Sequence, residues 1–272
     1  MTPTRWILVK NEEWAERNKS KDYDHILQTD RSREFSMEYI YESLRRDKII
    51  NAIEQHGGKK ILDVGCGPNP IFKYIPDVNF YIGVEPSKLF YDNAMKLATS
   101  VSNGRIKILL GKIEAAVSSI PDEEYDFIIL SSLLHEVEDP GKVLKLIQPF
   151  CNSKTLILAV VPNTRSIHRL LAYKSGLIAS IYEDSDKDKL FGRKTHFDIN
   201  KFQELFRKNG FCVIKTETFF MKFLSDSQLE AMLESGIISK KTLTALEKMS
   251  EYIPDFGAEI YLEAKKPENT ED

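Results

Sequence analysis

Lys60-Ile61-Leu62-Asp63-Val64-Gly65-Cys66-Gly67 is the stretch of sequence that decides the fold. Its first five residues are a short, mostly apolar run, which is typical of a buried strand. The glycines that follow allow the backbone to bend sharply and to approach a ligand closely. In open α/β sheets, ligands bind at the carboxyl ends of the strands. We therefore expect a strand over 60–64 and, directly after it, a loop that binds a ligand.

The sequence after this loop alternates between apolar runs and helical patterns. Further strands are expected over 80–84, 105–110, 125–130, 155–161, 211–219 and 258–264. Ser87 and Asp139-Pro140 mark two helix starts, because Ser and Asp cap helices and Pro is favoured in the first turn. Near-continuous apolar strands that alternate with helices indicate a parallel sheet with helices on both faces. Because such crossovers are right-handed, we predict a doubly wound, mostly parallel, seven-stranded α/β fold.

Segments that lack this alternation flank and interrupt the predicted sheet. The expected division of the chain is a helical cap or lid over 1–56, a sheet domain over 57–266 and a tail over 267–272, with inserts over 164–195 and 220–257. Within the cap, apolar residues at helical spacing predict a helix over 35–53, which Gly57 ends. The first insert is expected to hold a helix over 167–181, and the second is expected to hold two helices around Gly236.

The composition narrows the class of protein and its partners. The 272 residues carry a net charge of −3, without the basic excess that nucleic-acid binders usually show, so no nucleic acid is expected. The cysteines are Cys66, Cys151 and Cys212, which are far apart, so neither a disulfide framework nor a cysteine zinc site is expected. The longest apolar run, Leu156 to Pro162, is too short to span a membrane, and Met1 to Lys10 lacks the apolar stretch of a signal peptide. We therefore expect a cytoplasmic protein without a membrane partner.

Two acids and one proline limit which cofactor the loop can bind. Glu85 closes the second expected strand, at a place where an acid can accept hydrogen bonds from both hydroxyls of a ribose. A dinucleotide site would need Gly-x-Gly-x-x-Gly, but Pro70 stands at the third glycine position. S-Adenosylmethionine carries an ammonium group that Asp63 could face, and its nucleoside carries no phosphate that needs a cradle. The residues therefore favour S-adenosylmethionine as the cofactor.

Four blocks of sequence occur in an order and at a spacing that match a known family. They are Ile61 to Gly67, Gly83-Val84-Glu85-Pro86-Ser87, Gly111-Lys112-Ile113-Glu114 and Tyr125 to Val137. On these blocks the sequence resembles the class I (seven-stranded, Rossmann-like) S-adenosylmethionine-dependent methyltransferases. The resemblance extends to the segment Asn209-Gly210-Phe211 and to the last strand. It implies an enzyme that transfers a methyl group from S-adenosylmethionine to an acceptor.

The resemblance also implies which residues contact the cofactor. The loop glycines would line its methionine end, with Ser131 and Leu133 beneath, and Glu85 would hold its ribose. Lys112 and Ile113 would lie beside the adenine, but Lys112 replaces a frequent acid, so a backbone contact from Ile113 is expected. The full implied set is Asp63, Gly65, Cys66, Gly67, Glu85, Pro86, Lys112, Ile113, Ser131 and Leu133.

The histidines supply candidates for the chemistry. Transfer of a methyl group to a hydroxyl requires the removal of a proton, and His is the usual general base near neutral pH. His135 lies just past the fourth expected strand, where related small-molecule methyltransferases often carry a histidine. His196, which precedes a helix expected over 200–208, is the second catalytic candidate, and His168 is a weaker one. The alternative interpretation is that these side chains cap or anchor loops.

The loop after the fourth strand argues against some classes of acceptor. Ser131-Ser132-Leu133-Leu134 stands where enzymes that methylate amino groups of nucleobases or glutamine carry an Asn-Pro-Pro-Tyr-like motif. We interpret Glu136, Glu138 and Asp139 as helix-start charges rather than as metal ligands. No metal is therefore expected.

The inserts are expected to select the acceptor. The first insert carries Arg165, Arg169, Arg193 and Lys194, which would suit a phosphate- or carboxylate-bearing small molecule or form a solvated charged face. We predict O-methylation of a small molecule in a glycan, nucleotide-sugar or secondary-metabolite pathway, by a monomer or homodimer. The alternatives are N-methylation of a small molecule, methylation of RNA or protein, and a non-catalytic regulatory protein that binds S-adenosylmethionine.

Overall fold

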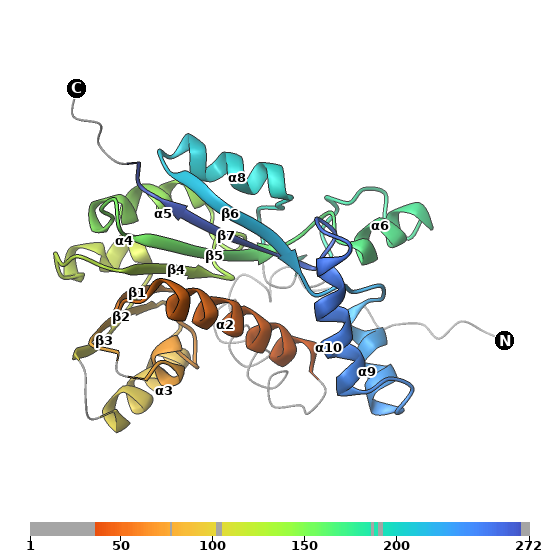
Figure 1. Ribbon diagram of the computed structural model, residues 1–272, viewed down its shortest axis with the longest axis horizontal. Helices are drawn as coiled ribbons and strands as arrows, with labels where there is room; N and C mark the ends of the chain where they lie inside the picture. The colour runs from red at the N-terminus through yellow and green to blue at the C-terminus, as the bar shows by residue number, and fades with distance from the viewer. Residues whose placement is uncertain (1–35, 77, 102–104, 186–187, 190–192, 268–272) are drawn as a thin grey trace, which may run out of the picture.

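A seven-stranded sheet forms the centre of the molecule. The computed structural model describes residues 36–76, 78–101, 105–185, 188–189 and 193–267 (Figure 1). The strands are β1 (Lys60–Val64), β2 (Phe80–Glu85), β3 (Arg105–Leu110), β4 (Phe127–Ser131), β5 (Leu156–Pro162), β6 (Cys212–Phe219) and β7 (Glu259–Lys265). Their order is β3-β2-β1-β4-β5-β7-β6, and β7 runs antiparallel to both of its neighbours. The predicted doubly wound, mostly parallel, seven-stranded α/β fold is confirmed.

Helices cover both faces of this sheet. They are α2 (Met37–His56), α3 (Lys88–Ser100), α4 (Ile113–Ala116), α5 (Pro140–Ile147), α6 (Ile167–Lys174), α8 (Ile199–Lys208), α9 (Asp226–Glu234) and α10 (Lys240–Lys248). Figure 1 places α4, α5 and α8 on one side of the sheet and α2 and α3 on the other. Each side has its own buried apolar cluster, as expected for strands buried on both faces.

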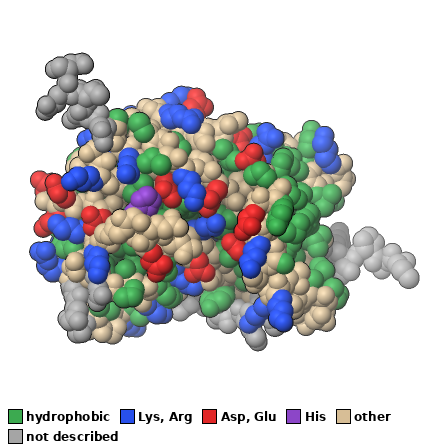
Figure 2. Space-filling view, in the orientation of Figure 1, with side chains coloured by type: hydrophobic (Ala, Val, Ile, Leu, Met, Phe, Trp, Pro, Cys, Tyr) green, Lys and Arg blue, Asp and Glu red, His purple; other side chains and the backbone are tan. Residues whose placement is uncertain are grey.

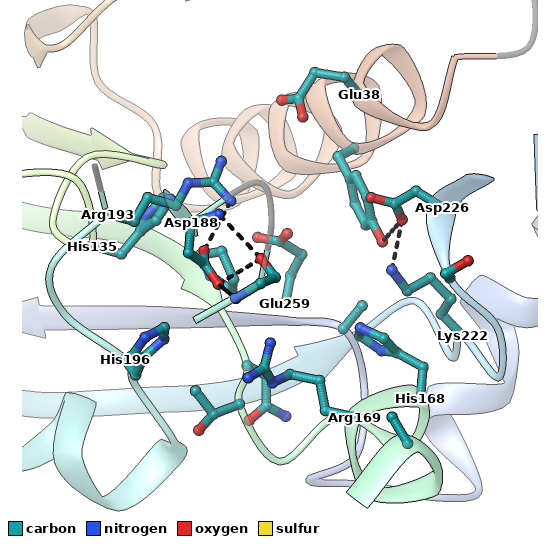
Figure 3. A pocket seen from close by; sticks show the side chains of 18 of the residues that line it. Glu38, His135, His168, Arg169, Asp188, Arg193, His196, Lys222, Asp226 and Glu259 are labelled. Carbon is teal, nitrogen blue, oxygen red and sulfur yellow. Dashed lines mark hydrogen bonds and ion pairs between the residues drawn. The ribbon is translucent and has the colours of Figure 1, made fainter. Parts of the chain in front are cut away.

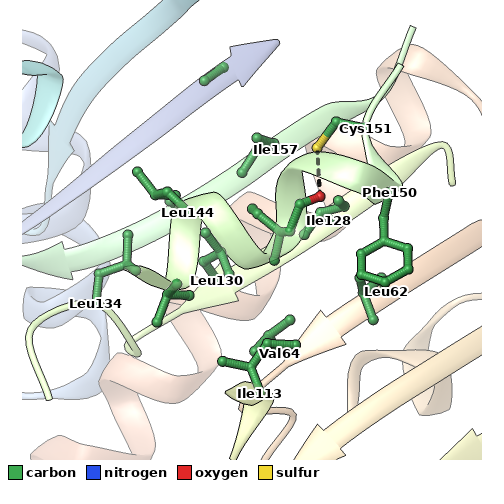
Figure 4. Packing of buried hydrophobic residues seen from close by; sticks show 14 of the residues in the cluster. Leu62, Val64, Ile113, Ile128, Leu130, Leu134, Leu144, Phe150, Cys151 and Ile157 are labelled. Carbon is green, nitrogen blue, oxygen red and sulfur yellow. Dashed lines mark hydrogen bonds between the residues drawn. The ribbon is translucent and has the colours of Figure 1, made fainter. Parts of the chain in front are cut away.

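The cluster under α5 explains why the middle strands carry continuous apolar runs. Leu130 and Ile157 on neighbouring strands pack against Leu144 of α5, and all three are fully buried (Figure 4). Cys151 lies at the edge of the same cluster, and its thiol donates to the carbonyl of Ile147 at 3.4 Å. Burial of an apolar side chain of this size contributes about 1.5–3 kcal/mol. Because β1, β4 and β5 are parallel neighbours, their carboxyl ends lie at one edge of the sheet.

The predicted helix starts are confirmed by their caps. The Ser87 hydroxyl accepts from the backbone N–H of Phe90 at 3.2 Å at the start of α3. The Asp139 carboxylate accepts from the backbone N–H of Lys142 at 2.9 Å, with Pro140 in the first turn of α5. Each cap satisfies a backbone donor that has no partner within its helix.

Two sequence predictions in this region are wrong. The helix expected over 167–181 ends at Lys174, because Gly176 takes a left-handed conformation with φ of 73° and stops it. Glu136 and Glu138 are not helix-start charges, since α5 begins only at Pro140. They instead form ion pairs with the first insert, as described below.

The remaining predictions about organisation fall partly outside the described residues. Residues 1–35 of the predicted cap and 268–272 of the predicted tail lie there, and the described part of the cap is α2. The second insert does contain two helices, α9 and α10, on either side of Gly236. Among the described helices, none is long and apolar enough to cross a bilayer. The cytoplasmic location and the oligomeric state stay predictions.

Candidate functional site

The loop after β1 is shaped by two glycines with left-handed backbones. Gly65 has φ of 78° and Gly67 has φ of 66°, which side-chain-bearing residues rarely adopt. The backbone N–H of Gly65 donates to the carbonyl of Val84 at 2.8 Å, which ties the loop to β2. A Cβ atom at Gly65 would lie 3.2 Å from the Leu133 side chain. The loop therefore passes close to the segment after β4, and a larger residue at position 65 would fill the space between them.

Asp63 lies beneath this loop as a buried acid. Its Oδ2 accepts a hydrogen bond of 2.6 Å from the hydroxyl of Tyr81. Burial raises the pKa of Asp63 to about 6, although the hydrogen bonds from Tyr81 and from the backbone of Ile71 lower it. The carboxylate therefore carries a negative charge at neutral pH and can attract a cation.

Glu85 joins the end of β2 to the same loop. Its Oε2 accepts from the backbone N–H of Gly67 at 2.8 Å, and its Oε1 accepts from that of Ser87 at 2.8 Å. These two hydrogen bonds hold the carboxylate at the carboxyl end of β2, beside the loop. The position of Gly83 in the same strand leaves no room for a side chain, because a Cβ there would lie 2.9 Å from the Cys66 sulfur.

A cavity of about 100 Å³ opens at the loop. Of the ten residues that the family resemblance implies, Asp63, Gly65, Cys66, Gly67 and Ser131 line it. The other five, Glu85, Pro86, Lys112, Ile113 and Leu133, do not line it. α2 closes the cavity from above with the side chains of Glu42, Arg45, Arg46 and Ile49.

The implied adenine residues lie at the next strand end. The backbone N–H of Gly111 donates to the carbonyl of Glu85 at 2.9 Å, which places the turn after β3 beside the end of β2. Lys112 is exposed there and precedes α4, whereas the side chain of Ile113 is buried in the core under α5. All four blocks of the resemblance therefore lie at the edge of the sheet where the parallel strands have their carboxyl ends.

A second cavity, of about 480 Å³, adjoins the first (Figure 3). Arg45 lines both. Its walls come from α2, the loop after β4, the end of β5, α6, the segment 222–227 and the start of β7. The first insert adds Ser185, Asp188, Arg193, Thr195 and His196. The two inserts thus form walls of this cavity rather than lying apart from it.

His135 lies in the wall of the larger cavity. Its side chain is 3 % exposed, and neither ring nitrogen has a hydrogen-bond partner among the described residues. The nearest carboxylate oxygen, Glu136 Oε1, lies 3.6 Å from Nε2. Burial holds the pKa of His135 well below its usual value, and the positive charges of Arg193 and Arg45 lower it further. The imidazole is therefore neutral at pH 7.

The other candidate histidines line the same cavity. His196 Nε2 lies 2.7 Å from Asp184 Oδ1, so a carboxylate orients its ring. His168 has a buried Nδ1 without a partner among the described residues. Burial lowers the pKa of His168 well below its usual value, and the charge of Lys222 adds to the effect. The structure thus brings together three histidines that are distant in sequence.

Sequence reasoning missed the buried charge network around the cavity. Arg45 donates to both oxygens of Glu259, from Nε at 3.1 Å and from Nη2 at 2.8 Å. Its Nη1 also donates to Glu38 at 3.5 Å. A signal was present, because Glu259 directly precedes the apolar run Ile260-Tyr261-Leu262, and an acid that is buried in this way needs a partner. The identity of that partner, 214 residues away, had no local signal.

Further ion pairs lie within the inserts or join the first insert to the loop after β4. Lys222 donates to Asp226 at 2.6 Å, and the Tyr41 hydroxyl donates to the same oxygen at 3.2 Å. In the first insert, Arg193 lies 3.6 Å from Asp188 and 3.5 Å from Glu136, and Lys194 lies 3.2 Å from Glu138. Glu136 and Glu138, which lie in the loop before α5, therefore contact the first insert. Among the described residues, no group of His, Cys, Asp and Glu side chains is arranged to hold a metal ion.

Comparison with known proteins agrees with this architecture. A family model described as a methyltransferase domain matches residues 37–235. No curated protein matches the sequence. One similar structure is an S-adenosylmethionine-dependent methyltransferase from Thermotoga maritima, described as a possible histamine N-methyltransferase. Its TM-score is 0.58 at 17 % sequence identity, and the match covers 92 % of this chain and 100 % of that one. Magnesium protoporphyrin IX methyltransferase from Synechocystis, with bound S-adenosylhomocysteine, has a TM-score of 0.60 at 11 % identity over 93 % of this chain and 98 % of its own.

The family match covers α2, the loop after β1 and the strands β1 to β6, and it ends before β7. The solved structures, at such low identity, establish the fold alone. The cofactor is S-adenosylmethionine, and the protein is an enzyme that transfers its methyl group to an acceptor. The chain belongs to the class I S-adenosylmethionine-dependent methyltransferases.

Proposed function

We propose that this enzyme methylates an oxygen atom of a small molecule that binds in the larger cavity. The observation that carries the proposal is the buried, neutral His135, whose ring nitrogens lack partners among the described residues. A volume of about 480 Å³ lies within the range of small-molecule sites, which is about 300–1,000 Å³. Lys and Arg side chains alternate with Asp and Glu over the face in Figure 2, and no continuous basic stripe crosses that face. This pattern favours a small acceptor over RNA.

We further propose that the cofactor binds at the loop after β1. Its residues would be those implied by the resemblance: Asp63, Gly65, Cys66, Gly67, Glu85, Pro86, Lys112, Ile113, Ser131 and Leu133. When bound, S-adenosylmethionine supplies a methyl group that its sulfonium already activates. Asp63 would face the ammonium group, which its negative charge supports, and Glu85 would accept from the ribose hydroxyls. The glycines keep this space free of side chains.

Cofactor binding would require side chains of α2 to move. The cavity at the loop, about 100 Å³, is smaller than a nucleoside with an amino-acid tail needs. Glu42 accepts from the side chain of Asn69 at 3.1 Å, and Arg46 stacks on the Tyr74 ring with 4.2 Å to its centroid. Both contacts are at the surface edge of the site and can be exchanged for contacts with a ligand. α2 would thus act as part of the lid that the sequence predicts over 1–56.

The proposed base is His135, acting at Nε2. An alcohol must lose its proton as it is methylated, whereas a neutral amine is already nucleophilic, so a buried neutral histidine suits oxygen better. The Glu136 carboxylate, 3.6 Å from Nε2, offsets part of the cost of the imidazolium that forms. His196, which Asp184 orients, would hold the acceptor from the first insert.

The cofactor part of the proposal is tested with Glu85→Ala. The variant loses a buried carboxylate that accepts two backbone hydrogen bonds and would also hold the ribose. We expect at least about a tenfold loss of S-adenosylmethionine affinity by calorimetric titration, since a hydrogen bond to a charged group contributes about 1.5–3 kcal/mol. Glu114→Ala, at an exposed residue of α4, is the control. Unchanged affinity in a folded Glu85→Ala variant would remove Glu85 from the site.

The catalytic part is tested with His135→Ala. Turnover is measured as formation of S-adenosylhomocysteine with a panel of hydroxyl acceptors and their amino analogues. We expect turnover of the preferred hydroxyl acceptor to fall by about 10²–10⁴, the usual contribution of a general base, at unchanged cofactor affinity. Equal turnover in the variant, or a preference of the wild type for the amino analogues, would overturn the assignment.

A further inference from the structure

The larger cavity has one end near the cofactor loop and one end away from it. The near end holds Arg45, which also lines the smaller cavity, and His135. The far end is formed by α6 and the segment before α9, which contribute His168 and Lys222 (Figure 3). An acceptor whose reacting atom meets the methyl group at the near end must extend its remaining atoms toward the far end. The far end therefore selects the acceptor.

The positive side chains that line the cavity are paired with carboxylates, with one exception among the described residues. The pairs are Arg45 with Glu259 at 2.8 Å, Arg193 with Asp188 at 3.6 Å, and Lys222 with Asp226 at 2.6 Å. Arg169 lines the same cavity and forms no ion pair with a described residue. The lining carries four Arg and Lys and four Asp and Glu, so its charges balance overall and the positive charge is local to Arg169. The carboxylates of Asp188, Glu183 and Asp184 act on Arg169 without forming an ion pair with it.

Neutral groups hold the Arg169 side chain in place. Its Nε donates to the carbonyl of Ile181 at 2.9 Å, and its Nη2 donates to the carbonyl of Glu183. Carbonyl oxygens orient a guanidinium without cancelling its charge. Figure 3 shows the side chain extending from α6 into the space between His168 and His196. Its Nη1 donates to no residue in the described part of the chain.

His168 adds a second donor beside this charge. It precedes Arg169 in α6, and its buried Nδ1 has no partner among the described residues. A neutral imidazole can donate one hydrogen bond, and a guanidinium donates several in a planar fork. A full positive charge with a neighbouring donor is the arrangement that binds carboxylates and phosphates.

We propose that the methyl acceptor carries a carboxylate or phosphate group, which Arg169 and His168 bind at the far end of the larger cavity. The inference rests on the proposed function and makes Arg169 the residue that selects an anionic acceptor. A cationic acceptor is disfavoured, because the described acids that line the cavity, Glu38, Asp188, Asp226 and Glu259, each take part in an ion pair.

The test uses small ions as probes of the far end. Methyl phosphate, acetate and choline are each titrated by calorimetry into the full chain saturated with S-adenosylhomocysteine, at ionic strength kept constant with chloride. We expect one or both anions to bind with a dissociation constant of millimolar order, the scale of a single charged group. The anion that binds more tightly identifies the group as phosphate or carboxylate. Choline is expected not to bind.

Two matched variants assign the binding to Arg169. Arg169→Gln removes the charge but keeps a polar side chain, and we expect it to weaken anion binding at least about tenfold. Arg165→Gln removes a charge from the same insert at an exposed residue that does not line the cavity, and it should bind the anions as the wild type does. Equal anion binding by wild type and Arg169→Gln, or binding of choline alone, would overturn the proposal.

A parallel titration separates this inference from the proposed function. S-Adenosylmethionine affinity should be unchanged in Arg169→Gln, which also shows that the variant is folded. If wild type binds S-adenosylmethionine but neither anion at tens of millimolar, this inference alone fails. If wild type does not bind S-adenosylmethionine, the proposed cofactor site fails whatever the anions do.

Discussion

The two cavities of this enzyme border on Arg45 but are built in different ways. Most of the smaller one comes from two short segments, 63–71 and 129–132, with α2 above them. The larger one is assembled from segments that run from Glu38 to Glu259, and two of its ion pairs, Arg45 with Glu259 and Arg193 with Glu136, join residues that are 214 and 57 positions apart. A site made from one loop can be recognised from sequence. A site that is assembled from tertiary contacts cannot be recognised in this way, and the pairing of its charges depends on the intact fold.

The largest effect is expected from Arg45→Met, because Arg45 connects the two cavities. The substitution leaves Glu259 as a buried carboxylate without its main partner. Breaking a buried pair in this way costs about 3–5 kcal/mol of the free energy of unfolding, measured by urea denaturation. Lys88→Met, which removes an exposed ion pair with Asp92, should cost about 1 kcal/mol or less.

A double variant sharpens this prediction. Arg45→Met with Glu259→Met removes both charges, so no buried carboxylate is left alone, and much of the lost stability should return. Failure of the second substitution to restore stability would mean that Arg45 acts through packing rather than through its charge. A cost of Arg45→Met below that of Lys88→Met would contradict the role of the buried pair altogether.

The contrast between local and distant contacts also explains which features could be predicted from the sequence. The bounds of β1 and β3 and the caps at Ser87 and Asp139 follow from local pattern and hydrogen bonding, and they match the structure. The roles of Glu136 and Glu138 were misread, because their partners Arg193 and Lys194 lie in a separate insert.

His135 and His196 were proposed from their positions along the chain, and both line the larger cavity. The residues next to them in the sequence do not indicate the environment of either side chain. The low pKa of His135 depends on burial and on the charges of Arg193 and Arg45, which only the folded chain brings near. The same is true of Arg169, because only the folded chain shows that the other described Arg and Lys side chains that line the cavity are paired.

A smaller effect is expected from pH at the cofactor loop. The pKa of Asp63 is about 6, so the carboxyl takes up a proton as the pH falls through that value. Because the proposed contact with the cofactor's ammonium needs the charged form, S-adenosylmethionine affinity should fall about tenfold between pH 7 and pH 5. The affinity is measured by calorimetric titration of S-adenosylmethionine at several pH values in this range.

Two variants test whether Asp63 causes the pH effect. Asp63→Asn should bind weakly at pH 7 and show no such dependence. Tyr81→Phe removes a hydrogen bond that lowers the pKa of Asp63, so the midpoint should move to higher pH. A pH profile that is the same in wild type and Asp63→Asn would exclude Asp63 as the titrating group.

The smallest effect is expected at the rim of the larger cavity, where Asp184 orients His196. The Asp184 side chain is 52 % exposed, so solvent screens the pair despite its short distance of 2.7 Å. Asp184→Asn keeps a hydrogen-bonding group, and the loss in free energy of unfolding should stay below about 1 kcal/mol. Turnover should fall only slightly, since His196 is proposed to hold the acceptor and not to take its proton. A loss of turnover as large as that of His135→Ala would instead identify the His196–Asp184 pair as the base. The proton would then be removed by a residue of the first insert rather than by one in the loop after β4.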